Sequence, residues 1–335
     1  MNLLFYLLVF LLVLIVSSTT NKLLPFLPMP LIQILLGIGI GLCLPNNQYH
    51  LDTELFLALV IGPLLFREAQ EADITSILKH WRIVLYLIFP VIFISALSMG
   101  GLAHVLWASL PLAACVAVGA ALGPTDLVAF ASLSQRFPFP KRVSNILKGE
   151  GLLNDASGLV AFRVALIAWT TGTFSLTQAG TSLAISIVGG FAVGLITALI
   201  NRFLHTFLLS VRATDIASEL LLELSLPLLT FFISEEIHVS GIIAVVVAGI
   251  LKASRFKKIN LLEAQVDTVT ETVWQTVTFM LNGSVFVILG MELEMIAEPI
   301  LKSAFYNKVL LLLSVFLLTF LLFVIRFVMI YGFYA

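Results

Sequence analysis

Apolar stretches of about the length that crosses a lipid bilayer recur from the first residues of the chain to the last. Of the 335 residues, 60% are hydrophobic and only 11% are charged, whereas a soluble protein would carry about 25% charged residues. In lipid every backbone N–H and C=O needs a partner inside the protein, so only helices and closed barrels span a membrane. The apolar runs do not alternate every second residue, as barrel strands do. The sequence therefore predicts an all-α polytopic membrane protein.

Eleven of these runs are predicted membrane spans. Because a bilayer core about 30 Å thick needs about 20 apolar residues in a helix, the third and ninth runs are short and could be tilted or buried among other helices. The polar segment 255–272 has apolar residues on one side, which predicts an amphipathic surface helix. The predicted spans are approximately residues 3–20, 24–44, 53–67, 81–101, 109–133, 148–170, 180–202, 216–234, 239–252, 274–292 and 306–331.

Lysines and arginines are distributed unequally between the two sides that these spans define. Of the eighteen, two lie within spans and only Lys302 and Lys308 lie in one set of alternate loops; the rest lie in the other set, which begins after the first span. Cytoplasmic loops carry the excess of basic residues, so we predict a multi-pass plasma-membrane protein with its N-terminus outside. A net charge of −1 gives no indication of a nucleic-acid partner. The residues of the basic set are Lys22, Arg67, Lys79, Arg82, Arg136, Lys141, Arg142, Lys148, Arg202, Arg212, Lys252, Arg255, Lys257 and Lys258.

The predicted span 109–133 contains Gly123-Pro124, which should interrupt the helix because proline lacks a backbone donor and clashes with the preceding turn. Thr125 and Asp126 are then placed to cap a second half-helix that begins near Leu127. In transporters, the ends of such broken helices build the substrate site. The alternative is a proline kink with a capping aspartate that binds nothing.

Three polar residues, Glu150, Asn154 and Asp155, fall inside the predicted span 148–170. An ionised carboxylate there costs about 2.5–3.5 kcal/mol, so it marks an ion or proton path by default. Glu150 and Asn154 are four residues apart and share a helix face, with Asp155 beside them. Asn154 adds a neutral carbonyl oxygen that suits a hard monovalent cation. The pattern favours an ion site at Asp155 over a structural pair with Arg163, which lies eight residues further along the helix.

Glu150 needs a cationic partner if it is ionised and buried. Arg326, in the predicted span 306–331, has no other obvious partner, so we predict a structural Glu150–Arg326 ion pair. No cofactor is expected, because Cys43 and Cys115 lie in apolar runs and the histidines lack metal-ligand spacing. An intramembrane aspartyl protease also uses two aspartates, but its Gly-x-Gly-Asp-type pattern is missing, so we expect no enzyme.

Residues 123–126 (Gly-Pro-Thr-Asp) and 149–155 (Gly-Glu-Gly-Leu-Leu-Asn-Asp) resemble the paired signatures of the NhaP/NHE branch of cation:proton antiporters. The usual forms are Ala-Pro-Thr-Asp-Pro-Val-Ala and Gly-Glu-Ser-Leu-Leu-Asn-Asp. Further similarity lies in residues 63–66, 240–249 and 326–327. The resemblance implies an NhaA/NhaP-like inverted-repeat fold in one transporter domain, residues 1–335. Residues 109–170 would form the first half of the ion-binding core and 274–335 the start of the second, and the other helices would form a scaffold and dimer face.

The resemblance also implies exchange of Na⁺, or of Li⁺ or K⁺, for H⁺ across the plasma membrane by alternating access. The cation and the proton would compete for Asp155, with Asn154, Thr125 and Asp126 shaping the site and Na⁺ bound at Asp155 and Thr125. Gly151 stands where the family usually has a serine, so one ligand must come from water or elsewhere. Leu127 likewise replaces a proline. A homodimer and the Glu150–Arg326 pair are implied as well.

In the family, the helix that carries the Arg326-type residue is followed by another broken helix and a final span. The sequence ends at Ala335, before both. We therefore expect an antiporter that lacks the last helices of the family fold. The alternative expectation is a transport-inactive or accessory fragment that needs those helices.

Overall fold

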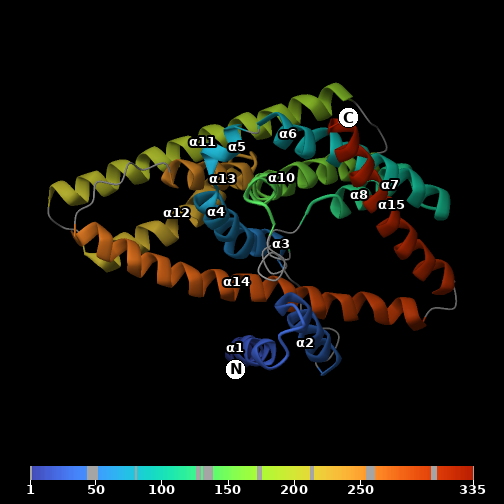
Figure 1. Cartoon of the computed structure of the whole chain (residues 1–335), viewed down its shortest axis with the longest axis horizontal. Coiled ribbons are helices and arrows are strands. Elements are labelled where there is room, and N and C mark those ends of the chain that lie inside the picture. Colours follow the sequence, from blue (N-terminus) through green and yellow to red (C-terminus); the bar gives the residue numbers. More distant parts are fainter. Residues whose placement is uncertain are drawn as a thin grey trace. The chain divides into compact units, whose positions relative to one another are not determined.

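The computed structural model describes residues 2–43, 52–79, 81–125, 130, 139–171, 176–211, 215–253, 261–302 and 308–334 (Figure 1). Over these ranges the chain forms helices and no strand, which confirms the predicted all-α class. The helices gather into two compact units. The described residues of unit 1 lie in Met1–Glu71 and Gly189–Lys302, and those of unit 2 lie in Ala72–Phe130, Phe137–Val188 and Ser303–Ala335.

Unit 1 is built on close helix crossings at glycine. A Cβ added at Gly37 would lie 2.2 Å from the carbonyl oxygen of Val287, and one added at Gly290 would lie 2.2 Å from that of Ile34. Small residues permit this approach, which holds helices together where the surrounding lipid is as apolar as leucine. The elements of unit 1 are α1 (Asn2–Leu23), α2 (Met29–Cys43), α3 (Thr53–Phe56), the π-helical η1 (Leu57–Ile61), α4 (Gly62–Glu71), the part of α11 (Leu176–Ser210) from Gly189, α12 (Ile216–Glu236), α13 (Gly241–Ala253) and α14 (Leu261–Lys302).

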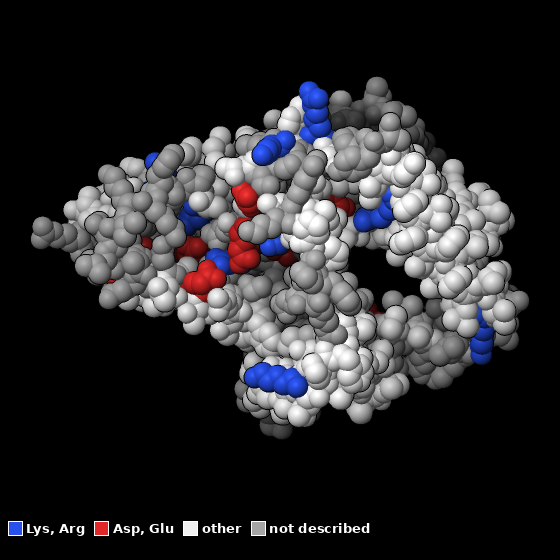
Figure 2. All heavy atoms as spheres, in the orientation of Figure 1, with Lys and Arg blue, Asp and Glu red and all other residues white. Residues whose placement is uncertain are grey.

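Charged side chains of unit 1 bind one another across its helices. Lys252 Nζ in α13 lies 3.3 Å from Glu223 Oε2 in α12. Arg67 in α4 binds Glu71 one turn later and Glu271 in α14. Figure 2 shows that charged side chains are few on the face it presents and that uncharged residues cover most of its described surface. Pairing of this kind lets charged side chains lie among apolar helices.

The predicted amphipathic surface helix over residues 255–272 lies partly outside the described residues, which resume at Leu261 with the start of α14. Residues 261–272 continue without a break into the predicted span 274–292, so that both belong to α14. Arg67 binds Glu271, and the fully buried Trp274 packs against Phe66 with ring centroids 6.0 Å apart. These contacts give Glu271 and Trp274 partners inside unit 1.

Unit 2 also has close helix crossings at glycine, which lie between α7 and α8. A Cβ at Gly119 would lie 2.3 Å from the carbonyl oxygen of Ala96, and one at Gly100 would lie 2.6 Å from the Cα of Val116. The elements of unit 2 are α5 (Ile74–Lys79), α6 (Trp81–Tyr86), the π-helical η2 (Leu87–Val91), α7 (Ile92–Leu106), α8 (Leu112–Leu122), α10 (Lys141–Thr171), the part of α11 up to Val188, and α15 (Lys308–Tyr334).

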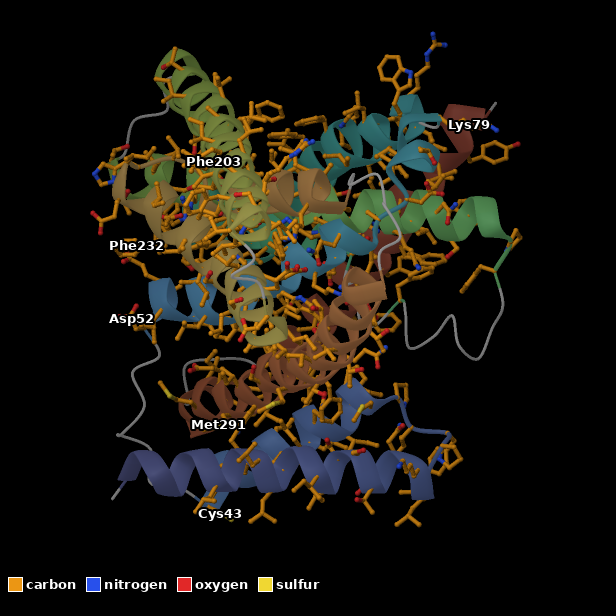
Figure 3. The ribbon with its side chains drawn as sticks, turned by 90° about the vertical axis from the view of Figure 1, so that its left-hand side faces the viewer. Cys43, Asp52, Lys79, Phe203, Phe232 and Met291 are labelled. Atoms are coloured by element: carbon orange, nitrogen blue, oxygen red, sulfur yellow. The ribbon has the colours of Figure 1, made fainter. Side chains whose placement is uncertain are left out.

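All eleven predicted spans overlap helices of the structure. Five helices within the described ranges are long and apolar enough to cross a membrane, and five apolar helices of 10–17 residues are shorter, so the count of eleven spans stays a prediction. Large apolar side chains face outward, as lipid contact requires: Phe203 on α11 is 70% exposed and Phe232 on α12 is 61% exposed (Figure 3). The five long helices are Trp81–Leu106, Ala184–Ser210, Ile216–Glu236, Thr268–Ala297 and Lys308–Gly332.

Candidate ion-binding site

The helix ends in unit 2 where Gly123-Pro124 predicts an interruption: α8 ends at Leu122, and residues 123–125 leave the helix. Proline explains the end, because Pro124 cannot donate the next backbone hydrogen bond. Gly158 of α10 packs directly on the proline ring, since a Cβ at that glycine would lie 2.3 Å from Pro124 Cγ. Asp126 and the half-helix predicted near Leu127 lie outside the described residues.

Glu150 is the centre of a hydrogen-bonded group between α10 and the break. Its side chain is 4% exposed. Its Oε1 accepts hydrogen bonds from Thr125 Oγ1 at 3.1 Å and from Asn154 Nδ2 at 2.8 Å. Glu150 and Asn154 thus share a helix face, as their spacing predicts. The carboxylate has the hydrogen-bond donors that a buried charge requires.

Arg326 of α15 joins this group from the other side. Its Nη2 lies 3.7 Å from Glu150 Oε1, and it also donates to the carbonyl oxygen of Gly123, while its Nη1 donates to Thr125 Oγ1. The carbonyl of Gly123 stands just after the end of α8. The structure therefore brings the two members of the predicted ion pair together, but the hydrogen bonds of the guanidinium go to the broken end of α8.

Thr125 was predicted as a Na⁺ ligand, and its hydroxyl is engaged on both sides. It accepts a hydrogen bond from Arg326 and donates one to Glu150. Its oxygen keeps one acceptor lone pair, because a hydroxyl has two.

Two buried atoms of the site have no hydrogen-bond partner among the described residues: Asn154 Oδ1 and Arg326 Nε. Asn154 is 0% exposed, and its amide nitrogen is already bound to Glu150. A buried carbonyl oxygen without a partner costs about 1–3 kcal/mol. Neutral oxygens of this kind are ligands that hard cations prefer.

Two further predicted site residues lie on α10. Gly151 is buried on the turn between Glu150 and Asn154. Asp155 follows Asn154 along the helix, and its side chain lies outside the described part of the structure. The ion-binding roles therefore stay predictions for Asp155, Asn154, Thr125, Asp126 and Gly151.

Sequence reasoning missed Ser157 and Gly158, which lie one turn beyond Asn154 on the same side of α10. Ser157 Oγ lies 3.2 Å from the carbonyl oxygen of Ile88 in η2, and Gly158 meets Pro124. Their spacing of three and four residues from Asn154 is the signal that could have found them, because it places them on the face of the site.

Comparison with known proteins identifies the family. The family model described as "Sodium/hydrogen exchanger, transmembrane" matches residues 7–335. A "Sodium, potassium, lithium and rubidium/H(+) antiporter" of Bacillus subtilis is 35% identical over 328 residues, which are 98% of this chain and 49% of that protein. Its namesake in Bacillus pumilus is 34% identical over 95% of this chain and 48% of that protein. The chain thus spans about half the length of these curated relatives.

A solved structure shows the same fold. The sodium proton antiporter MjNhaP1 of Methanocaldococcus jannaschii matches with a TM-score of 0.69 at 19% sequence identity, over 95% of this chain and 77% of that chain. This match and the apolar helices agree with an NhaP-like membrane protein. Because the family model covers nearly all of the sequence, the chain belongs to the sodium/hydrogen exchanger family.

Proposed function

We propose that this chain exchanges Na⁺ for H⁺ across the plasma membrane by alternating access, with Li⁺ and K⁺ as alternative cations. The relatives named above are antiporters of Na⁺, K⁺, Li⁺ and Rb⁺ against H⁺, which supports this class of substrate. Family resemblance further supports a homodimer as the working assembly.

The observation that carries the proposal is the carbonyl oxygen of Asn154. It is buried, accepts no hydrogen bond from a described residue, and lies one residue before Asp155 and one helical turn from Glu150. An acceptor of this kind suits a cation that has shed its water. Because Glu150 is already bound to Thr125 and Asn154, Asp155 is the carboxylate that we assign to the transported ions.

Exchange follows from competition for one carboxylate. A proton and a cation cannot occupy Asp155 together, so the departure of one makes room for the other. With a single titrating acid at the site, one Na⁺ moves for one H⁺ and no net charge crosses the membrane. The membrane potential, about 2.3 kcal/mol per charge per 100 mV, would then not drive the cycle.

The test is Na⁺-induced proton movement in everted membrane vesicles that contain the protein. We expect Asp155→Asn to abolish the movement, because an amide cannot take up a proton or neutralise a cation. Asp52→Asn is the matched control, because Asp52 caps α3 in unit 1 through the amides of Glu54 and Leu55 and lies on no helix of the site. Its variant should exchange at the parental rate. Parental exchange by Asp155→Asn would eliminate the assignment.

The unmutated chain is measured first, because it spans 77% of the solved relative and about half of the curated ones. Exchange by the chain alone supports the proposal. An inert chain that becomes active when fused to the following helices of the Bacillus subtilis relative would support the alternative of an accessory fragment.

A further inference from the structure

The junction of α6 and η2 touches both helices that carry the candidate site. The hydroxyl of Tyr86, the last residue of α6, donates to the carbonyl oxygen of Met329 in α15 at 3.1 Å. The hydroxyl of Ser157 in α10 donates to the carbonyl oxygen of Ile88 in η2 at 3.2 Å. Met329 follows Arg326 by three residues, so its bond lies about one helical turn from the guanidinium-bearing residue.

On α10 the contacts with this junction also lie about one helical turn from the residues of the site. Ser157 follows Asn154 by three residues, and Ile146, which precedes Glu150 by four, packs into the apolar cluster formed by α6 and η2. The junction therefore touches α10 on both sides of the Glu150–Asn154 turn. Met329 packs against the same cluster from α15.

The end of α8 also lies close to the segment that continues from α6 through η2. A Cβ at Gly123 would lie 3.7 Å from the side chain of Ile92, the first residue of α7 after η2. Gly123 provides the carbonyl that Arg326 binds. One continuous segment, residues 86–92, thus contacts all three elements whose side chains form the site.

The backbone of this segment is unusual where it makes these contacts. Pro90 lies inside η2 and has no N–H, and the five residues Leu87–Val91 form a π-helical turn. Such turns occur frequently at functional sites. Ile88 is 2% exposed and Ser157 is 7% exposed, so no bulk water competes for the hydroxyl, whose other acceptor is Asn154 O at 2.9 Å in its own helix.

We propose that Tyr86 and Ser157 are positioning residues of the exchanger. Through the segment 86–92 their hydroxyls hold α10 and α15 in register, so that Arg326 reaches Thr125, Gly123 and Glu150 while Asn154 Oδ1 stays free for the ion. Neither residue touches the ion. The consequence for transport rests on the proposed function, whereas the register of the two helices does not.

The variants remove one hydroxyl each: Tyr86→Phe, Ser157→Ala and the double variant. Two matched controls remove hydroxyls that do not join these elements. Ser314→Ala in α15 deletes a buried hydroxyl bonded to Leu311 O of its own helix, and Tyr331→Phe alters a tyrosine that is 69% exposed on α15. Ser157→Thr keeps the hydroxyl, so this variant should retain the parental behaviour that Ser157→Ala loses.

The first readout is the distance between spin labels at Val143 on α10 and Val328 on α15, in a background with Cys43→Ser and Cys115→Ala. Both label positions are exposed, at 41% and 58%. We expect a broader distance distribution in Tyr86→Phe and Ser157→Ala than in the parent and the controls. An unchanged distribution, or the same broadening in the controls, would overturn the proposal.

The second readout is the dependence of exchange on Na⁺ concentration. We expect the apparent KM for Na⁺ to rise about 3–10-fold in each single variant, and less than multiplicatively in the double variant because both hydroxyls act on one segment. A merely structural role would lower the amount of active protein and hence the maximal rate, with KM unchanged, and that result would contradict the positioning role. If the unmutated chain shows no exchange, the proposed function fails and the label distances alone decide the inference.

Discussion

At the scale of single residues, the site is organised around one shared hydroxyl and one buried carboxylate. Thr125 accepts from Arg326 and donates to Glu150, so the charges of arginine and glutamate are joined through it as well as directly across 3.7 Å. Asn154 completes the set by donating to the same carboxylate oxygen. The hydroxyl of Thr125 and the amide nitrogen of Asn154 therefore share Glu150 as their acceptor.

Removing that carboxylate should destabilise the fold strongly. Glu150→Ala leaves the hydroxyl of Thr125 and the amide of Asn154 without their common acceptor and removes the carboxylate beside Arg326. Breaking a buried pair costs about 3–5 kcal/mol. Because the side chain of Arg326 is 25% exposed, we expect the lower end, about 3 kcal/mol, measured by unfolding of the purified protein in detergent.

The control for this variant is Glu71→Ala. Glu71 also pairs with an arginine, Arg67, but its side chain is 61% exposed, so its loss should cost no more than about 1 kcal/mol. Equal losses in the free energy of unfolding for the two variants would contradict a larger contribution of the buried group around Glu150.

At the scale of elements, the site depends on the contact between α10 and the broken end of α8. Pro124 follows the end of α8 and is half-buried, and Gly158 provides the flat surface on which its ring rests. A side chain at residue 158 would push the two elements apart and would displace Gly123 and Thr125 from Arg326.

Gly158→Ala should therefore lower stability by about 1–3 kcal/mol, the usual cost of overpacking, although alanine is the better helix former. Gly101→Ala in α7 is the control, because its Cβ would meet nothing within 4 Å and should raise stability by up to about 1 kcal/mol. Thermal unfolding of both variants gives the comparison. A stabilised Gly158→Ala would contradict the packing described for the break.

Sequence alone predicted those elements whose cause is local. Pro124 ends α8 by the chemistry of its own ring. The Glu150–Arg326 pair is not local, but it could be predicted because few other basic residues lie inside the predicted spans. The continuation of α14 could not be predicted, because Glu271 finds Arg67 only through the tertiary fold. The roles of Tyr86 and Ser157 were missed for the same reason: their acceptors are backbone carbonyls, which no sequence pattern marks.

At the scale of the whole molecule, the distribution of basic residues predicts how the chain lies in the membrane. The loop after α1 belongs to the basic set, and the loop between α7 and α8 belongs to the opposite one. With the N-terminus outside, Phe26 lies on the cytoplasmic side and Leu110 on the external side.

Single cysteines test this orientation in the background without Cys43 and Cys115. Phe26 and Leu110 are 68% and 41% exposed, so a membrane-impermeant maleimide can reach either when it lies on the outer side. In intact cells we expect labelling of Leu110→Cys and protection of Phe26→Cys, which is labelled after permeabilisation. The reverse pattern would contradict the orientation.

The proposed exchange depends on one carboxylate, Asp155, that a cation and a proton would occupy in turn. The most direct measurement is the number of protons released when Na⁺ is added to the purified protein in weakly buffered detergent solution. Near the pH at which half of the sites are protonated, we predict release of about half a proton per chain from the parent, rising toward one at lower pH where Na⁺ still saturates the site, and no release from Asp155→Asn. Absence of release from the parent while Na⁺ binds, or equal release from Asp155→Asn, would contradict competition at Asp155.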